Sequence, residues 1–226
     1  MATRDEASDQ RTRILIVDDH PIVREGLAEV LSREPDLVVC GEAGDPRAAL
    51  EALAACRPDA AIVDLSLGGA SGLDLVRDIK ARYPEVAVLV LTMHDEALYA
   101  ERALRAGARG YIMKREAAQS VVGALRRVLG GAIYVSEQLT GSMLGQFIGG
   151  HHAAPASPVG SLSDRELHVF ELIGQGLGTR GIAGQLHISV KTVEAHRAHI
   201  KGKLQLKDAT ELLQHATLWL REEGEA

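Results

Sequence analysis

Five side chains that could handle a phosphoryl group lie at the ends of short apolar runs in the first half of the chain. Asp18, Asp19 and Asp64 lie at the carboxyl ends of two strand-like runs, and Thr92 and Lys114 end two more. If these runs are parallel strands of one sheet, all five side chains meet at its carboxyl edge, where open α/β sheets bind their ligands. The pattern therefore predicts a site for a divalent cation and a phosphoryl group.

The residue types predict distinct roles within this site. Asp18, Asp19 and Asp64 offer the oxygen ligands that Mg²⁺ prefers. With the cation reducing the charge of an incoming phosphoryl group, the Asp64 carboxylate can attack phosphorus and form an acyl phosphate. Thr92 can donate a hydrogen bond to one phosphoryl oxygen, and Lys114 can pair with another. Such residues are often only solvated, but matching positions at four strand ends favour the chemical role.

The elements that must position these residues alternate between strand and helix five times. Short apolar runs, each followed by a helical pattern, predict a parallel sheet covered on both faces. Right-handed crossovers then give a doubly wound, flavodoxin-like α/β fold with strand order 2-1-3-4-5. The expected strands are 13–17, 37–41, 59–63, 86–91 and 109–113, and the expected helices are 21–33, 45–56, 72–82, 95–106 and 116–129.

The chain changes character after Val135. A stretch rich in Gly, Ala and Pro predicts a linker, with one more helix possible over 137–148. Ser163-Asp-Arg-Glu166 is a capping box, and four short helices with a tight turn between the second and third suggest a helix-turn-helix. The expected organisation is a disordered start (1–12), an α/β domain (13–134), the linker (135–160) and an all-α domain (161–226).

Bulk properties exclude some classes of protein. The net charge is −6, so any nucleic-acid binding must come from a local basic surface. Cys40 and Cys56 lack metal-type spacing and are expected to be small buried residues in a reducing compartment. The start of the chain has no apolar signal segment, and the longest apolar run is too short to cross a bilayer. A soluble cytoplasmic protein with no membrane partner is expected.

Four motifs in the first domain resemble the receiver domain of bacterial response regulators, nearest to the NarL/FixJ type. The motifs are Leu15-Ile-Val-Asp-Asp-His-Pro21, Val63-Asp-Leu-Ser-Leu-Gly-Gly-Ala-Ser-Gly72, Leu91-Thr-Met-His-Asp95 and Gly107-Ala-Arg-Gly-Tyr-Ile-Met-Lys114. The resemblance implies that Asp64 accepts the phosphoryl group from a sensor histidine kinase. It also implies that Asp19 binds Mg²⁺ directly, that Asp18 helps, often through water, and that the Ser66 carbonyl is a further ligand.

The same resemblance implies a switch formed by Thr92 and Tyr111. Thr92 moves toward the phosphoryl group, and the Tyr111 ring then turns inward. Two residues depart from the common pattern, since Gly68 and Arg115 stand where many receivers have proline. The first departure is expected to loosen the loop after the third strand.

The second domain resembles the LuxR-type helix-turn-helix through Leu162-Ser-Asp-Arg-Glu-Leu167 and Ile188-Ser-Val-Lys-Thr-Val-Glu-Ala-His-Arg197. Residues 189–207 carry five Lys or Arg against Glu194 alone, which is the local charge that a phosphate backbone requires. Helical spacing turns one face of this helix toward the major groove of double-stranded DNA. The residues expected to contact DNA are Arg180, Lys191, Thr192, Glu194, Ala195, Arg197, Ala198, Lys201 and Lys203.

The prediction is thus a transcriptional regulator, and not a classical enzyme, whose homodimerisation and DNA binding respond to phosphorylation. Two alternatives stay open. One is a Mg²⁺-dependent phosphohydrolase acting through an aspartyl phosphate, although no second acid lies two residues after Asp64 to protonate a leaving group. The other is a regulator that binds DNA regardless of phosphorylation.

Overall fold

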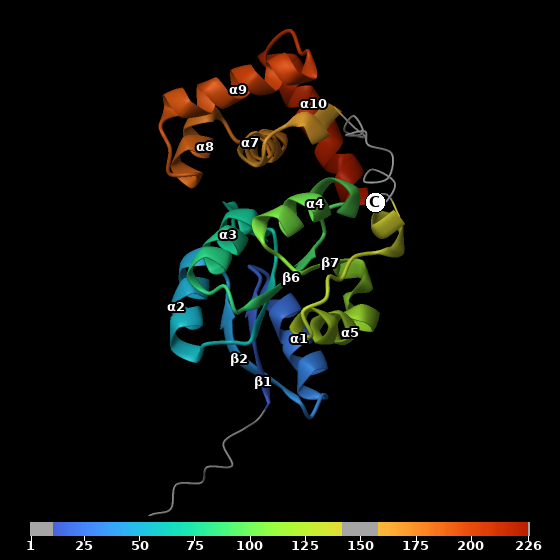
Figure 1. The fold of residues 1–226 in the computed structure, drawn as a ribbon. Helices are drawn as coiled ribbons and strands as arrows, with labels where there is room; N and C mark the ends of the chain where they lie inside the picture. The colour runs from blue at the N-terminus through green and yellow to red at the C-terminus, as the bar shows by residue number, and fades with distance from the viewer. Residues whose placement is uncertain (1–10, 142–157, 226) are drawn as a thin grey trace, which may run out of the picture.

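The chain forms an α/β lobe and a smaller helical lobe (Figure 1). The computed structural model describes residues 11–141 and 158–225. The five-stranded parallel sheet has the order β2-β1-β3-β6-β7. This is the predicted order 2-1-3-4-5, because β4 and β5 form a separate hairpin and the fourth and fifth strands of the sheet are therefore labelled β6 and β7. Its strands are β1 (Thr12–Val17), β2 (Leu37–Ala43), β3 (Ala60–Val63), β6 (Ala87–Thr92) and β7 (Gly110–Met113). The predicted doubly wound fold is confirmed.

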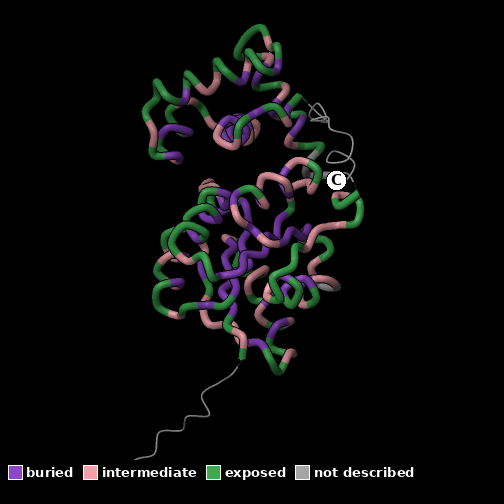
Figure 2. The backbone as a smooth tube through the Cα atoms, in the orientation of Figure 1, coloured by how far each residue is buried: buried purple, intermediate pink, exposed green. Residues whose placement is uncertain are grey.

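Helices cover both faces of this sheet because its strands are apolar on both faces. Residues of β1, β3 and β6 alternate between two buried clusters, as period-2 geometry requires. The helices are α1 (Pro21–Ser32), α2 (Pro46–Cys56), α3 (Gly72–Arg82), α4 (Glu96–Ala106) and α5 (Ala117–Leu129), preceded by the 3-10 turn η1 (Lys114–Glu116). Leu15 and Val63 pack with α2, α3 and α4, whereas Ile16 and Ile62 pack with α1 and α5. Figure 2 shows the buried backbone gathered along the sheet.

A small hairpin after β3 corrects the expectation of a loose loop there. Strands β4 (Ser66–Leu67) and β5 (Ala70–Ser71) pair antiparallel around a two-residue turn. Gly68 and Gly69 both have positive φ, +60° and +88°, which proline cannot adopt. The Gly68 N–H also donates to Asp19 Oδ2 at 2.9 Å, so a proline there would remove a hydrogen bond to the acidic cluster.

Gly72 brings α3 close to the end of β3. A Cβ atom at this position would lie 2.1 Å from the Asp64 carbonyl oxygen, so only glycine fits. The Gly72 N–H donates to the Leu65 carbonyl at 2.8 Å. The start of α3 therefore fixes the backbone that carries Asp64.

The smaller lobe is the predicted four-helix unit. The short turn η2 (Pro158–Ser161) leads into α7 (Asp164–Gly174), α8 (Thr179–Gln185), α9 (Val190–Leu204) and α10 (Ala209–Glu225). Both parts of the predicted capping box are present at Ser163 and Glu166, and the Ser189 hydroxyl caps α9. The last helix runs from Ala209 to Glu225.

Part of the expected linker lies outside the described residues. Residues 137–141 are helical, and the rest of the helix expected over 137–148 falls in the undescribed stretch. Residues 1–10 of the expected disordered start also lie outside. Among the residues that the structure describes, no helix is long and apolar enough to cross a membrane.

The two cysteines differ from expectation. Cys40 and Cys56 are half-buried rather than fully buried, and their sulfur atoms lie 2.9 Å apart.

Candidate phosphoryl site and DNA-binding helix

The five predicted side chains meet at the carboxyl edge of the sheet. Asp18 follows β1, Asp64 follows β3 and Lys114 follows β7. The Lys114 Nζ atom lies 2.7 Å from Asp64 Oδ2 and 2.6 Å from Asp18 Oδ2, so one ammonium joins both carboxylates. Asp18 and Asp64 are almost fully buried, and Thr92, at the end of β6, is fully buried. The sheet has therefore brought together residues that are up to 96 positions apart in the chain.

Burial and charge compete in this cluster. Burial raises the pKa of Asp64 above its ordinary value, although Lys114 and Thr92 oppose the shift and Asp18 reinforces it. Burial acts to lower the pKa of Lys114, but Asp64 and Asp18 outweigh it, so the pKa of this ammonium is raised. Lys114 thus stays charged and offsets two buried carboxylates.

The acidic cluster fits a metal ion. Asp18, Asp19, His20 and Asp64 each offer a ligand atom, and these atoms all lie within 4.8 Å of one another. Among the described residues, the buried Asp64 Oδ1 has no hydrogen-bond partner, and the buried Asp19 Oδ1 has only the His20 Nδ1 atom beside it, 2.7 Å away. Buried oxygens of this kind normally have a partner, and a bound cation would provide one.

The residues of the predicted switch lie beside this cluster. Tyr111 is buried, so its ring already occupies the inward position, and its hydroxyl donates to the His94 carbonyl oxygen at 2.8 Å. The His94 Nε2 atom lies 2.8 Å from the Ser66 hydroxyl. Burial, reinforced by Lys114, lowers the pKa of His94 to about 4, so the ring is neutral at neutral pH. His94 therefore links the hairpin after β3 to the end of β6.

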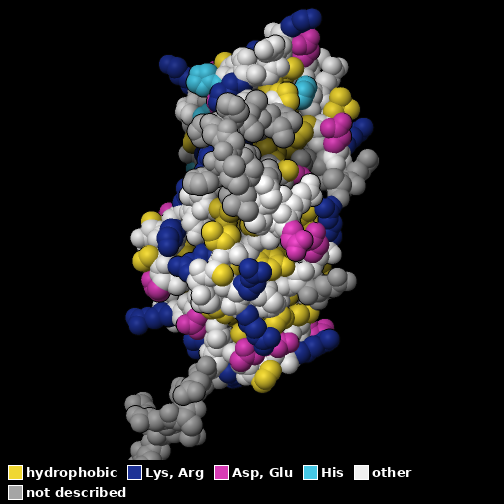
Figure 3. Space-filling model, turned by 45° about the vertical axis from the view of Figure 1, so that its right-hand side comes forward, with side chains coloured by type: hydrophobic (Ala, Val, Ile, Leu, Met, Phe, Trp, Pro, Cys, Tyr) yellow, Lys and Arg dark blue, Asp and Glu magenta, His cyan; other side chains and the backbone are white. Residues whose placement is uncertain are grey.

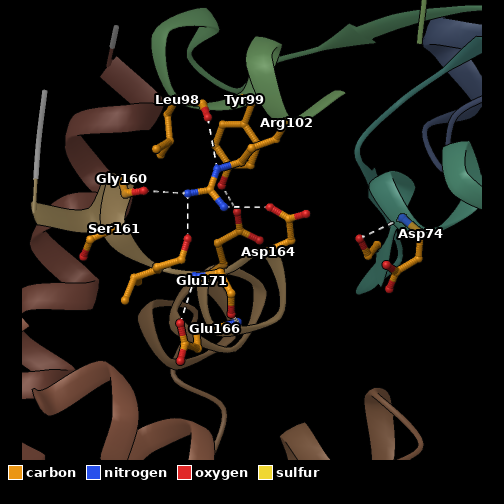
Figure 4. A network of polar contacts seen from close by, with 12 residues as sticks. Asp74, Leu98, Tyr99, Arg102, Gly160, Ser161, Asp164, Glu166 and Glu171 are labelled. Carbon is orange, nitrogen blue, oxygen red and sulfur yellow. Dashed lines mark hydrogen bonds and ion pairs between the residues drawn. The ribbon is translucent and has the colours of Figure 1, made fainter. Parts of the chain in front are cut away.

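A polar network joins the two lobes (Figure 4). Arg102 of α4 donates to Asp164 at 2.7 Å, to the Gly160 carbonyl at 3.0 Å and to the Leu162 carbonyl at 2.7 Å. Its side chain is only 14% exposed. One guanidinium of the α/β lobe thus holds both the segment before α7 and the first turn of α7.

Further contacts extend this network toward the phosphoryl site. The Tyr99 hydroxyl donates to Glu171 of α7, and the Tyr99 ring lies 4.4 Å from the His94 ring, centroid to centroid. His168 of α7 is also buried where α7 meets Tyr99 and His94. Burial, together with the nearby Arg165, lowers its pKa to about 4. The network therefore begins at His94, which contacts Ser66, and ends on α7.

The predicted recognition helix is α9, and it lies on the side of α7 that faces away from the α/β lobe (Figure 1). Val193, Ile200 and Leu204 are buried and form the inner face of this helix. The residues of the opposite face that the structure places in solvent are Lys191, Thr192, Glu194, Ala195 and Ala198. The contact between the lobes leaves this face uncovered.

The other predicted DNA contacts differ in their surroundings. Arg180 on α8 is exposed, and Arg197 and Lys201 are half-buried. The Lys203 ammonium binds Glu166 Oε2 at 2.6 Å and the Ser161 carbonyl at 3.2 Å. Lys203 therefore has a structural role in this arrangement. On the face seen in Figure 3, the Lys and Arg side chains of the α/β lobe are mixed with Asp and Glu.

Sequence reasoning missed three residues of these sites. His20 joins the acidic cluster, and the only signal for it is its place directly after the aspartate pair. Arg24, on the first turn of α1, donates to the Asp18 carbonyl at 2.6 Å. Arg102 had no signal, because its partners Gly160, Leu162 and Asp164 lie at the end of the linker and in the second domain.

Comparison with known proteins identifies the class that this fold and site define. Residues 14–126 match the response regulator receiver domain, and residues 160–216 match the bacterial regulatory proteins of the luxR family. The chain belongs to the response regulators that join a receiver to a LuxR-type helix-turn-helix, as its motifs predicted. Members of this family are phosphorylation-dependent transcription regulators, and the phosphohydrolase alternative is not favoured.

Individual relatives cover nearly the whole chain. The oxygen regulatory protein NreC of Staphylococcus haemolyticus (strain JCSC1435) is 40% identical over 208 residues, which span 90% of this chain and 96% of that protein. NreC of Staphylococcus aureus (strain MRSA252) is 39% identical over 208 residues, which again span 90% of this chain and 96% of that protein. The structure of RcsB from Salmonella enterica serovar Typhimurium, bound to promoter rprA with phosphomimetic BeF3−, is 25% identical with a TM-score of 0.69, covering 92% of this chain and 98% of that one.

Proposed function

We propose that Asp64 is the phosphoacceptor of this regulator and that Asp18, Asp19 and the Ser66 carbonyl complete a Mg²⁺ site around it. The observation that carries this proposal is the buried Asp64 carboxylate, which lies 2.7 Å from Lys114 and has one oxygen without a hydrogen-bond partner among the described residues. A solvated surface aspartate would need neither feature.

The side chains of the chain itself account for phosphoryl transfer. A sensor histidine kinase presents a phosphohistidine, an Asp64 oxygen forms a bond to phosphorus, and the P–N bond breaks with its electron pair left on the imidazole. Lys114 pairs with a phosphoryl oxygen, and the Thr92 hydroxyl donates to another. When bound, Mg²⁺ would neutralise charge on the phosphoryl oxygens and the carboxylates.

Phosphorylation then acts on the second domain by shifting a population. Thr92 is drawn toward the phosphoryl group while Tyr111 stays inward, and this favours the arrangement that forms a homodimer and binds double-stranded DNA. We place the protein in the bacterial cytoplasm, where the DNA lies. The boundaries that suit this function are a receiver over 13–134, a linker over 135–160 and a DNA-binding domain over 161–226.

Intact mass after incubation with Mg²⁺ and a small phosphodonor tests the phosphoacceptor. We expect one added phosphoryl group on the native protein and none on Asp64→Asn, which keeps the size of the side chain but removes the nucleophilic oxygen. Omitting Mg²⁺ should suppress labelling of the native protein. Equal labelling of both proteins would show that the acceptor is another residue, and no labelling with any donor would favour a regulator independent of phosphorylation.

A lysine exchange tests the recognition face of α9. Lys191 is exposed on that face, so Lys191→Ala should weaken DNA binding about tenfold and lower the dependence of log K on log salt by about 1. Lys207→Ala is the matched control, because Lys207 is 86% exposed but lies beyond the end of α9 and pairs with Glu211. Electrophoretic mobility shifts at several salt concentrations give both quantities. Equal losses in the two variants would mean that only overall charge matters.

A further inference from the structure

The register of β2 has an irregularity at one cysteine. Ile14 of β1 pairs with Val39, and the next residue, Leu15, pairs with Gly41, so Cys40 is an extra residue in the strand. A bulge of this kind re-aims side chains, because two residues oppose one on the partner strand. Cys40 is thereby turned toward the face of the sheet that α2 covers.

Gly41 leaves room for a sulfur pair at this position. A Cβ atom on Gly41 would lie 3.4 Å from the Cys56 sulfur and 3.6 Å from the Ala52 side chain, so the space that a side chain would fill is open to Cys40. Cys56 ends α2, and its sulfur lies 2.9 Å from that of Cys40. Both residues are half-exposed, so small solutes can reach them.

We propose that Cys40 and Cys56 form a redox-active dithiol, which a peroxide converts into an intramolecular disulfide between β2 and α2. An S–S bond is about 2.05 Å long, so the two sulfurs need to approach by only roughly 0.9 Å. Side-chain rotation supplies such a movement without displacing the sheet or the helix.

The reaction balances with a peroxide as the oxidant. Cys56 gives up its thiol proton and the thiolate attacks one peroxide oxygen, so the O–O bond breaks and Cys56 becomes a sulfenic acid. The hydroxide that leaves takes up the proton released by the thiol and becomes water. The Cys40 sulfur then attacks the Cys56 sulfur, the S–O bond breaks, and the Cys40 proton leaves with the hydroxyl as a second water. Two thiols lose two hydrogens, and hydrogen peroxide is reduced to two molecules of water.

The order of attack follows from the environment of Cys40. Burial, together with the hydrogen bond to Cys56, raises the pKa of Cys40 to about 12. Cys40 therefore stays protonated at neutral pH and donates its S–H to Cys56. A thiolate is the reactive form of cysteine, so the first attack falls to Cys56.

The pair lies far from the phosphoryl chemistry. Cys56 is at the amino-terminal edge of the sheet, where its carbonyl accepts a hydrogen bond from the Arg13 side chain, whereas Asp64 and Lys114 lie at the carboxyl edge. Oxidation should thus leave phosphate acceptance unchanged. It should make the receiver more resistant to heat, because the bond closes a loop within the unfolded chain.

Thiol counting on the full chain tests the proposal. The reduced protein is treated with hydrogen peroxide, denatured and alkylated with N-ethylmaleimide before its intact mass is measured. We expect two maleimide groups before oxidation and none after it, with a monomer that has lost two hydrogens and regains both thiols on treatment with dithiothreitol. The thermal midpoint of the oxidised protein should rise by roughly 5–10 °C.

Single-cysteine variants keep the result interpretable. Cys40→Ser and Cys56→Ser each retain one thiol and should give no monomer that has lost two hydrogens, while both still accept phosphate on Asp64. If the native protein keeps an alkylatable thiol, or oxidises only to disulfide-linked dimers, the proposal is overturned. Because phosphate acceptance is measured separately, failure of the dithiol is distinguishable from failure of the phosphoacceptor.

Discussion

Replacing Lys114 with alanine is expected to lower the free energy of unfolding of the metal-free protein by about 3 kcal/mol. Lys114 is the ammonium that joins Asp18 and Asp64, both with side chains only 3% exposed. Without it, two nearly buried carboxylates face each other and lose the positive charge that lies between them. Urea unfolding, followed by circular dichroism in a chelating buffer, measures the loss.

Two conditions should reduce this loss. Mg²⁺ should restore much of the stability, because the cation replaces the missing positive charge between the carboxylates. Acidification should also narrow the difference between variant and native protein, since protonation removes the unpaired charge of Asp64, whose pKa burial already raises. The variant should be phosphorylated about a hundredfold more slowly even with Mg²⁺, because a donor to the transferring group is missing.

Lys80→Ala is the control for the Lys114 variant. Lys80 is exposed on α3 and, within the described part of the chain, donates only to the Pro84 carbonyl, so its removal should change stability by no more than about 0.5 kcal/mol. A Lys114 variant as stable as this control in chelating buffer would mean that the carboxylates do not depend on the ammonium.

Arg102→Ala should open the contact between the two lobes. Arg102 gives three hydrogen bonds to Gly160, Leu162 and Asp164, and its removal leaves these acceptors without that donor. We expect the closed arrangement to weaken by about 3 kcal/mol, which is roughly a hundredfold in the opening equilibrium. Small-angle scattering should show a larger radius of gyration, and amide exchange should quicken on α4 and α7.

The same variant tests how the contact relates to DNA binding. If phosphorylation acts by releasing the contact, the unphosphorylated Arg102→Ala protein should bind DNA more tightly than the native protein, because less free energy is needed to reach the binding-competent state. Arg105→Ala is a matched control on the same helix, since Arg105 is 73% exposed and pairs only with Glu101 among the described residues. An open variant with unchanged DNA affinity would separate domain contact from regulation.

The sequence alone was enough to predict the α/β fold and the strand order. Short apolar strands buried on both faces allow few topologies, and polar residues at matching strand ends must meet at one edge. For this reason Asp18, Asp64 and Lys114 could be grouped before any coordinates were known. Local signals also sufficed for the helix-turn-helix, where the capping residues Ser163 and Ser189 mark helix starts.

Several local features needed the full chain geometry. The hairpin around Gly68 and Gly69 depends on backbone angles that glycine permits but does not require. The engagement of Lys203 by Glu166 depends on how α9 packs on α7. A positive charge on a helix predicts affinity for phosphates, yet it does not reveal which carboxylate lies within reach of it.

The sequence by itself determined which residues could carry the chemistry, because residue type and strand periodicity are local properties. Only the tertiary structure decided the contact of Arg102 with α7 and the approach of Cys40 to Cys56. Both depend on distances between segments that no short-range pattern encodes: a docking of one domain on another, and a single extra residue in an edge strand.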